Sequence, residues 1–398
     1  MPEVIVVGAG LAGLACARHL ARHGVEVVVR EAADAVGGRV RTDRVDGMLL
    51  DRGFQVHNTG YPEARRVLDH PALDLRPFAA GALVRVGDRL HRVGDPRRVP
   101  TWAASTALAP IGSISDKARI LQLSARAALG SADRLLAAPE TTTREALRQR
   151  GLSDTVVDRF FRPFLSGVLL EDELATSSRL FDLVWRSFAL GTQAVPAAGM
   201  QAIPEQLARG LDVRLDSPVD TVAPGRVDGE TARAVVVATG ATVAARLVPG
   251  LVVPALRRVT TLYHLAPEPP VTEAAVVLDG ERSGPAVNSV VLTQAAPSYA
   301  PGRHLVSSSV LAWGVPEPEV RAHLARVYGV DTSRWEHVAS YDVEDALPAM
   351  PPPMGRFRRD VRLDHGLFVC GDHRDSASIQ GALVSGRRAA TAVLKELA

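Results

Sequence analysis

The segment EVIVVGAGLAGLACARHLARHGVEVVVRE, residues 3–31, constrains the fold more than any other part of the chain. Its first apolar run, VIVV, is continuous, as expected for a strand buried on both faces of a parallel sheet. Gly8, Gly10 and Gly13 follow with the spacing G-x-G-x-x-G and open a helical pattern that ends at Gly24. A second apolar run, VEVVV, completes a strand–helix–strand unit, which predicts an α/β fold.

The same turn predicts a ligand. Gly8 permits the tight turn, Gly10 lets the backbone approach a pyrophosphate, and Gly13 lets helix and strand pack closely. The first helical residues, Leu11 and Ala12, offer free N–H groups at the positive end of the helix dipole. We therefore expect the phosphates of a dinucleotide at this helix N-terminus.

Glu31 closes the second strand, 18 residues after Gly13, and is placed to accept hydrogen bonds from a ribose diol. The alternative is a glycine turn that binds nothing, which the strand before, the helix after and this acid all disfavour. The motif alone leaves FAD and NAD equally open.

The next segments, GGRVRT at residues 37–42 and LLDRGFQV at residues 49–56, complete a resemblance. The series resembles the amino end of the flavin-containing amine oxidase, protoporphyrinogen oxidase and phytoene desaturase superfamily. The resemblance implies that Gly37, Gly38 and Arg39 lie along the pyrophosphate of a non-covalent FAD, where an arginine suits phosphate geometry. The alternative for Arg39 is an ordinary surface arginine after a glycine turn.

A second part of the resemblance lies in FVCGDHRDSASIQGALVSGRR, residues 368–388. In the superfamily a late Gly-Asp turn, here Gly371-Asp372, lies near the ribityl chain and pyrophosphate. The helix that follows points its N-terminus at the flavin, where it stabilises negative charge. The resemblance assigns that N-terminus to Ile379, Gln380 and Ala382. The alternative is an ordinary docking helix with an aspartate in its approach loop.

A third part is the strand and turn ARAVVVATG, residues 232–240. The resemblance places Ala238, Thr239 and Gly240 beside the dinucleotide and the backbone of Val219 at the adenine edge. The alternative is a plain core strand. Because these parts are far apart in sequence, the cofactor domain is predicted to be discontinuous.

The resemblance implies an α/β fold with two domains. The first is a Rossmann-like FAD-binding domain of the glutathione reductase type, with a central parallel sheet and helices, and the second is an α+β substrate domain. Residues 75–199 are expected to be mostly helical, and residues 252–341 strand-rich with a helix at 317–328. The FAD domain is assigned to residues 1–75, 200–250 and 342–398, and the substrate domain to residues 76–199 and 251–341.

Two absences bear on the chemistry. Amine oxidases of the superfamily usually keep a lysine near the flavin and an aromatic residue just after the late Gly-Asp turn. Here residues 252–341 contain no lysine and residues 376–382 no aromatic side chain. The chain is therefore closest to phytoene dehydrogenase-like oxidoreductases, which take hydride from an apolar small molecule onto FAD. An amine oxidase with an atypical site, a flavin-dependent isomerase without net oxidation, and a flavin protein without turnover stay open.

Few side chains are candidates for contact with a substrate. Gln55 follows the family-like DRGF and is predicted to reach the flavin, and Tyr263 lies on a strand expected to cross near the ring. These two are the predicted catalytic residues. His264 and Asn288 are weaker candidates. For each of them a purely structural role is the alternative.

Composition limits the partners. A formal net charge of +2 gives no support for nucleic-acid binding, and the two cysteines stand at neither disulfide nor metal spacing. With no secretory leader in view, a cytoplasmic location is expected. The apolar stretch at residues 234–245 is too short to span a bilayer, which takes about 20 residues. Lipid contact is expected to be peripheral at most, near residues 100–108, where Trp102 stands beside Arg97 and Arg98. The oligomeric state is not predicted.

Overall fold

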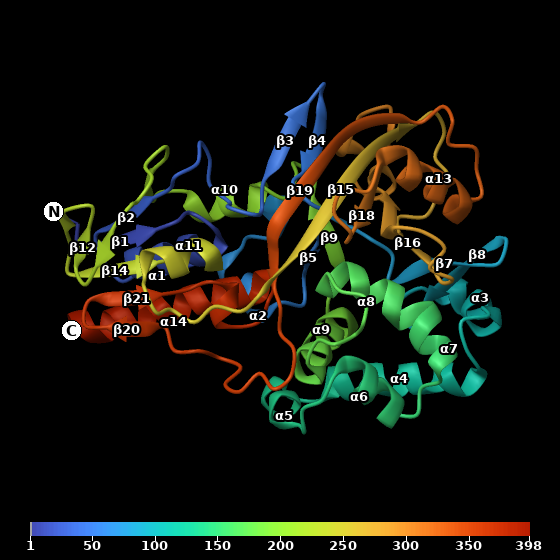
Figure 1. Ribbon diagram of the computed structural model, residues 1–398, viewed down its shortest axis with the longest axis horizontal. Coiled ribbons are helices and arrows are strands. Elements are labelled where there is room, and N and C mark those ends of the chain that lie inside the picture. Colours follow the sequence, from blue (N-terminus) through green and yellow to red (C-terminus); the bar gives the residue numbers. More distant parts are fainter. Residues whose placement is uncertain (1) are drawn as a thin grey trace.

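Three separate parts of the chain build the first sheet, shown on the left of Figure 1 in the computed structural model, which describes residues 2–398. Its first five strands run parallel and the last pairs antiparallel at one edge. The strand β1 (Val4–Val7), in the middle of the sheet, is buried at every position, as its continuous apolar sequence predicts. In spatial order the strands are β10 (Asp212–Arg214), β2 (Val27–Arg30), β1 (Val4–Val7), β14 (Ala234–Val237), β21 (Leu367–Val369) and β20 (Arg362–Asp364).

The two faces of this sheet pack against different layers, because successive side chains of a strand point to opposite faces. Val4 and Val6 pack with helices on one face, whereas Ile5 and Val7 pack on the other. The first face is covered by α1 (Leu11–Ala21), α10 (Ala202–Ala208) and α14 (Ile379–Leu397). The second is covered by α11 (Ala241–Leu247) and by the antiparallel ribbon β11 (Val222–Ala223), β12 (Arg226–Val227) and β13 (Glu230–Thr231).

A seven-stranded sheet forms the upper right of Figure 1 and is antiparallel except where β16 pairs in parallel with β7. The helix α13 (Glu317–Tyr328) covers it and has the bounds predicted from sequence. Its strands in order are β19 (Glu336–Pro348), β15 (Leu256–Ala266), β18 (His304–Val310), β17 (Ala286–Val291), β16 (Val276–Asp279), β7 (Gly81–Val86) and β8 (Arg89–Gly94).

This sheet corrects two expectations. The segment 75–199 is not mostly helical from its start, because β7 and β8 form a hairpin that extends the sheet through β16. The boundary expected at residue 342 falls inside β19, a strand that pairs with β15 over most of its length. The strand therefore belongs with the second sheet as far as Pro348.

A lobe of helices lies below the second sheet, at the lower right of Figure 1. Phe160, Phe161, Phe181 and Trp185 form an aromatic cluster in its core, with neighbouring rings in edge-on and tilted contacts. Its helices are α3 (Ala103–Leu108), α4 (Ile114–Leu129), α5 (Ala132–Ala137), α6 (Thr143–Gln149), α7 (Asp154–Val156), α8 (Arg162–Leu169) and α9 (Ser178–Leu190), with a π-helical turn at Val157–Phe161 before α8.

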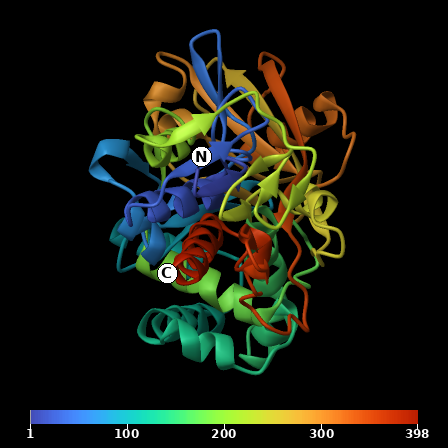
Figure 2. The same cartoon turned by 90° about the vertical axis from the view of Figure 1, so that its left-hand side faces the viewer.

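Shorter elements connect the two sheets and the lobe. Figure 2, turned to face the first sheet, shows α14 beneath the strands and the helical lobe below it. Among residues 2–398, no helix combines the length and the apolar character needed to cross a bilayer. The connecting elements are β3 (Thr42–Val45), β4 (Met48–Asp51), β5 (His57–Asn58), β6 (Leu75–Pro77), β9 (Gln193–Pro196), α2 (Pro62–Val67) and α12 (Leu292–Ala295).

Candidate active site

A cavity of about 1060 Å³ is lined by both sheets and by the helical lobe. This volume is at the upper end of the range for small-molecule and cofactor sites. It lies at the carboxyl ends of β1, β14 and β21, the edge at which open parallel sheets bind ligands. The predicted cofactor residues that line it are Gly8, Gly10, Leu11, Ala12, Glu31, Gly37, Gly38, Arg39, Val219, Ala238, Thr239, Gly240, Gly371, Asp372, Ile379 and Ala382.

The second and third glycines of the first turn, Gly10 and Gly13, serve different purposes. A Cβ on Gly10 would meet no atom within 4 Å, so the cavity reaches the backbone here. A Cβ on Gly13 would lie 2.0 Å from the carbonyl oxygen of Gly8. Gly13 does not line the cavity, and its role is the close packing of helix on turn that the sequence predicted.

The start of α1 is open to a ligand. Gly10 is the N-cap and provides no side-chain acceptor for the N–H groups of the first turn. Leu11 and Ala12, which carry two of those N–H groups, both line the cavity. An anion at this helix end would satisfy them and would interact favourably with the dipole.

The Gly-Gly turn lies directly beside the first turn. The N–H of Gly37 donates to the carbonyl of Ala9 at 2.9 Å, and a Cβ on Gly38 would be 3.5 Å from the Cα of Gly10. Glu31 is held by the N–H of Ala9, which donates to its Oε2 at 2.6 Å. The carboxylate is therefore fixed at the cavity wall with acceptor capacity left for a diol.

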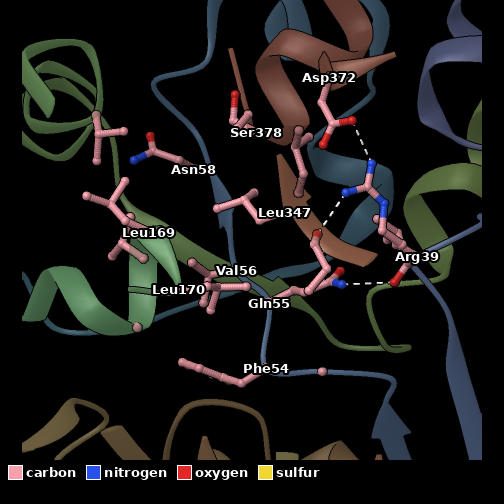
Figure 3. A pocket seen from close by; sticks show the side chains of 18 of the residues that line it. Arg39, Phe54, Gln55, Val56, Asn58, Leu169, Leu170, Leu347, Asp372 and Ser378 are labelled. Atoms are coloured by element: carbon pink, nitrogen blue, oxygen red, sulfur yellow. Dashed lines mark hydrogen bonds and ion pairs between the residues drawn. The ribbon is translucent and has the colours of Figure 1, made fainter. Parts of the chain in front are cut away.

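Arg39 connects the amino-terminal turn to the late Gly-Asp turn (Figure 3). Its guanidinium donates to Oδ1 of Asp372 at 2.7 Å and to the carbonyl of Ala346 at 2.8 Å. Burial disfavours the charge, but the carboxylates of Asp372 and Asp345 outweigh burial and raise the pKa of Arg39. Because 35% of the Arg39 side chain remains exposed, the cation is also available to an anion in the cavity.

The N-terminus of α14 corrects one expectation, the placement of Gln380 at the cavity. The hydroxyl of Ser378 accepts from the N–H of Gly381 at 3.0 Å and so occupies part of this helix end. The backbone of Gly381 lies against Ser376. A Cβ at position 381 would be 1.8 Å from the carbonyl oxygen of Ser376, so only glycine fits there. Gln380 does not line the cavity, and its side-chain oxygen accepts from the N–H of Glu63 instead.

Of the two predicted catalytic residues, only Gln55 lines the cavity. Its Nε2 donates to the carbonyl of Arg39 at 2.9 Å, and its Oε1 has no partner (Figure 3). Tyr263 is fully buried away from the cavity and donates its hydroxyl to the carbonyl of Asp51 at 2.8 Å. His264 is buried as well and bonds to Glu317.

Three more amide side chains line the cavity: Asn288, which was a candidate from sequence, and Asn58 and Gln193, which were not. Asn288, a weak candidate, lines the cavity with an unpartnered Oδ1. Asn58 and Gln193 face each other across β5 and β9, and both line it. No local motif marks Asn58 or Gln193 as a site residue. They reach the cavity because the two-residue strand β5 pairs with β9. Lys117 also lines it and donates to the carbonyl of Ala107.

The rest of the wall on the lobe side is mostly apolar, and its further polar side chains are Arg98, Thr106, Ser124 and Ser187. Figure 3 shows Leu169 and Leu170 facing the segment of Phe54 and Val56 across the cavity. One carboxylate, Asp95, reaches this side, and it is bonded to Arg97. The other apolar side chains here are Ile111, Ile120, Leu121, Phe160, Phe164, Val168, Val184, Trp185 and Phe188.

A family profile described as flavin containing amine oxidoreductase matches residues 11–394. The chain belongs to this family. FAD is the cofactor that the family implies, and the site fits it: an open backbone at Gly10, uncapped N–H groups, a fixed glutamate and a partly exposed arginine surround one cavity. Among the described residues 2–398, no cluster of histidine, cysteine and acid side chains has the composition of a metal site.

Individual relatives cover only parts of the chain. Lysine-specific histone demethylase 1B of Mus musculus is 28% identical over 234 residues, 55% of this chain and 26% of that protein. Protoporphyrinogen oxidase 2 of Arabidopsis thaliana is 31% identical over 170 residues, 43% of this chain and 33% of that protein. These matches thus span a quarter to a third of the relatives' own lengths.

Solved structures extend the likeness to the whole fold. Wild-type putrescine oxidase bound to putrescine superposes with a TM-score of 0.72 and 19% identity, covering 99% of both chains. At this identity the likeness concerns the fold. Within the flavin-containing amine oxidoreductase family, the protein is an FAD-dependent oxidoreductase with the α/β, Rossmann-like fold predicted from sequence.

Proposed function

We propose that this oxidoreductase dehydrogenates a largely apolar small molecule, using non-covalently bound FAD. The observation that carries the proposal is the apolar lobe-side wall, whose one carboxylate, Asp95, is already paired with Arg97. A cationic amine needs a free carboxylate or aromatic rings to replace its hydration, and although this wall has aromatic rings, it has no free carboxylate and carries the like charge of Lys117. An uncharged carbon skeleton needs neither and gains free energy from the removal of apolar surface from water.

Each part of the site has an assigned role in this proposal. FAD bound along Gly10, Arg39 and Asp372 supplies the hydride acceptor. The apolar lobe-side wall orients the substrate and excludes water. Gln55, whose Oε1 is unpartnered, accepts a hydrogen bond from a polar group of the substrate. The substrate would lose a hydride to FAD and a proton to solvent, and a double bond would form between the two atoms that lose them.

Non-covalent binding is supported by the positions of the cysteines. Cys16 and Cys370 are both buried, and neither lines the cavity. Burial and a hydrogen bond with Cys370 raise the pKa of the Cys16 thiol, so that no thiolate forms near neutral pH. Neither sulfur is a nucleophile for attachment of a flavin.

Amine oxidation is the second candidate, favoured by family membership and by the likeness to putrescine oxidase. The relation to protoporphyrinogen oxidase 2 supports the first candidate, since that protein is named as an oxidase of protoporphyrinogen. The missing lysine in residues 252–341 and the missing aromatic residue in 376–382 weigh against the amine.

Mass analysis of the product separates the candidates. The purified protein is incubated with FAD and with two donor sets, isoprenoid hydrocarbons and porphyrinogens on one side, putrescine and cyclohexylamine on the other. Dehydrogenation gives a product that has lost two hydrogen atoms per turnover. Amine oxidation followed by hydrolysis of the imine instead releases ammonia, together with an aldehyde from putrescine or a ketone from cyclohexylamine, and isomerisation leaves the mass unchanged. Release of ammonia, or an unchanged mass, overturns the proposal.

A further inference from the structure

Four large apolar side chains stand exposed on two neighbouring helices of the lobe. Leu108 ends α3 and is 84% exposed, while on α4 Ile114, Leu121 and Leu129 are 81%, 43% and 88% exposed. Isolated exposed leucines are common, but a group of this kind marks an interaction site. Trp102, from which lipid contact was expected, is buried and does not belong to the group.

Five apolar residues of α4 form a stripe along the helix, in which Ile114, Ala118, Leu121 and Leu129 are exposed and Ala125 is half-buried. Positions 114, 118, 121, 125 and 129 follow the spacing of four, three, four and four residues that keeps side chains on one helical face. The opposite face holds Leu123 and Ala127, which are buried in the lobe core. The helix thus has a second apolar face that nothing in the described chain covers.

The charge beside this stripe is basic. Arg119 and Arg126 are exposed on α4, and Arg134 follows on α5. Residues 103–137 contain four basic side chains and two acidic ones, and one of the acids, Asp116, is buried in the N-cap of α4. An apolar stripe with an arginine edge is the pattern of a helix that lies in the interface of an anionic bilayer.

The same helices form one end of the cavity. Leu121 is exposed and also lines the cavity, as do Ala103 and Ala107 of α3. Ile120 and Ser124, which lie one helical turn apart on α4, also line the cavity. A molecule entering between α3 and α4 would pass from the exposed stripe directly to the apolar lobe-side wall.

We propose that α3 and α4 dock on an anionic lipid surface through Leu108, Ile114, Leu121 and Leu129, and that the apolar substrate enters from the bilayer beside Leu121. The docking surface stands on the exposed side chains and their charge, whereas the entry route rests on the proposed function. The leucines enter the acyl boundary, and Arg119 and Arg126 lie at the level of the lipid phosphates.

Co-sedimentation with vesicles tests the docking surface without any substrate. The full chain, loaded with FAD, is mixed with phosphatidylcholine vesicles and with vesicles containing one part in three of phosphatidylglycerol. The wild type binds the anionic vesicles, and the double variant Leu108→Ser/Leu129→Ser binds roughly a hundredfold more weakly, since each leucine contributes about a factor of ten. The variant Val252→Ser removes an apolar side chain that is 77% exposed outside these helices and is the matched control.

The outcomes separate this inference from its rivals. Arg119→Glu/Arg126→Glu should abolish the preference for anionic vesicles, and salt should weaken binding of the wild type. Equal sedimentation of wild type and Leu108→Ser/Leu129→Ser overturns the proposal. So does a wild type that forms dimers without lipid while the double variant is monomeric, because the surface is then an interface between two copies. Turnover of an apolar donor in detergent is measured separately, so that failure of the catalytic proposal is recognised by itself.

Discussion

The guanidinium of Arg39 donates to the carboxylate of Asp372 across 2.7 Å, although 333 residues separate the two in sequence. The pair joins the Gly-Gly turn after β2 to the Gly-Asp turn after β21 and thereby closes the cofactor end of the cavity. Asp372 is almost fully buried, whereas Arg39 keeps a third of its side chain exposed. The pair therefore fixes one charge and leaves the other available to a phosphate.

Asp372→Asn tests this pair. The amide keeps the shape of the side chain but loses the charge-assisted bond to Arg39, so FAD binding should weaken by roughly 10- to 100-fold. Fluorescence titration of the apoprotein with FAD measures the change. Asp74→Asn is the control, because its ion pair with Arg76 is half exposed and should change binding less than about twofold. Equal effects of the two variants would refute the assignment.

The first turn allows a paired test of two glycines. Gly10→Ala adds a methyl group to open cavity space. The unfolding free energy of the apoprotein should therefore stay within about 0.5 kcal/mol of the wild-type value, whereas FAD affinity should fall at least about tenfold. Gly13→Ala forces a methyl group against the carbonyl of Gly8 and should destabilise the fold by about 1–3 kcal/mol. Urea unfolding of the apoprotein and FAD titration distinguish the two. Wild-type FAD affinity of Gly10→Ala contradicts the site.

Gln55 and Tyr263 differ in what their removal should change. Gln55→Leu removes a cavity side chain and should slow flavin reduction by roughly tenfold with FAD affinity unchanged within about twofold. Tyr263→Phe removes a buried hydrogen bond to Asp51 and should cost about 1 kcal/mol of unfolding free energy at an unchanged reduction rate. Rapid-mixing absorbance gives the rate. A slowed Tyr263→Phe would place that tyrosine in the chemistry after all.

Asp51 predicts a pH dependence of stability. Burial raises its pKa from 3.8 to about 6, although Thr42, Met200 and Tyr299 donate hydrogen bonds that oppose the shift. Because the folded protein holds this proton more tightly than the unfolded chain, the contribution is fully present below about pH 4 and is lost as the pH rises through 6. A shift of about two units corresponds to about 3 kcal/mol.

Urea unfolding of the wild type and of Asp51→Asn between pH 4 and 7 measures that contribution. The buried histidines His57 and His373 act in the opposite direction over the same range, since burial lowers the pKa of each to about 4. The difference between the two proteins cancels their effect. As the pH rises from 4 to 7, the unfolding free energy of Asp51→Asn should increase by about 3 kcal/mol relative to that of the wild type. A constant difference would show that Asp51 is ionised at no cost in the folded state.

Local patterns predicted what depends on neighbours in sequence. The strand–helix–strand unit at the amino end and the bounds of α13 follow from turn glycines and apolar spacing, and the structure has both. The hairpin of β7 and β8 has a local signal, the two-residue turn Gly87-Asp88, which the prediction overlooked. Its pairing with β16, some 190 residues later, has none. Nothing near Gly81 records that pairing, which is decided by tertiary contact.

The candidate site shows the same division. Glycines, Glu31 and Arg39 could be located because the backbone needs them at fixed offsets along the chain. The direction in which the side chain of Tyr263 points could not be predicted, because the register of β15 against β19 shifts between Tyr263 and His264. Such a shift changes which side chains reach the cavity, and no sequence pattern marked it. Asn58 and Gln193 likewise meet only through a short strand pairing.

The most direct test of the account is one anaerobic visible spectrum of the purified protein, recorded before and after single additions of apolar donor, putrescine and NADPH. The account predicts a flavin band that the apolar donor bleaches and that putrescine and NADPH leave in place. Bleaching by putrescine would establish an amine oxidase, and bleaching by NADPH a reductase or isomerase role. A colourless protein that takes up no FAD would contradict the site itself.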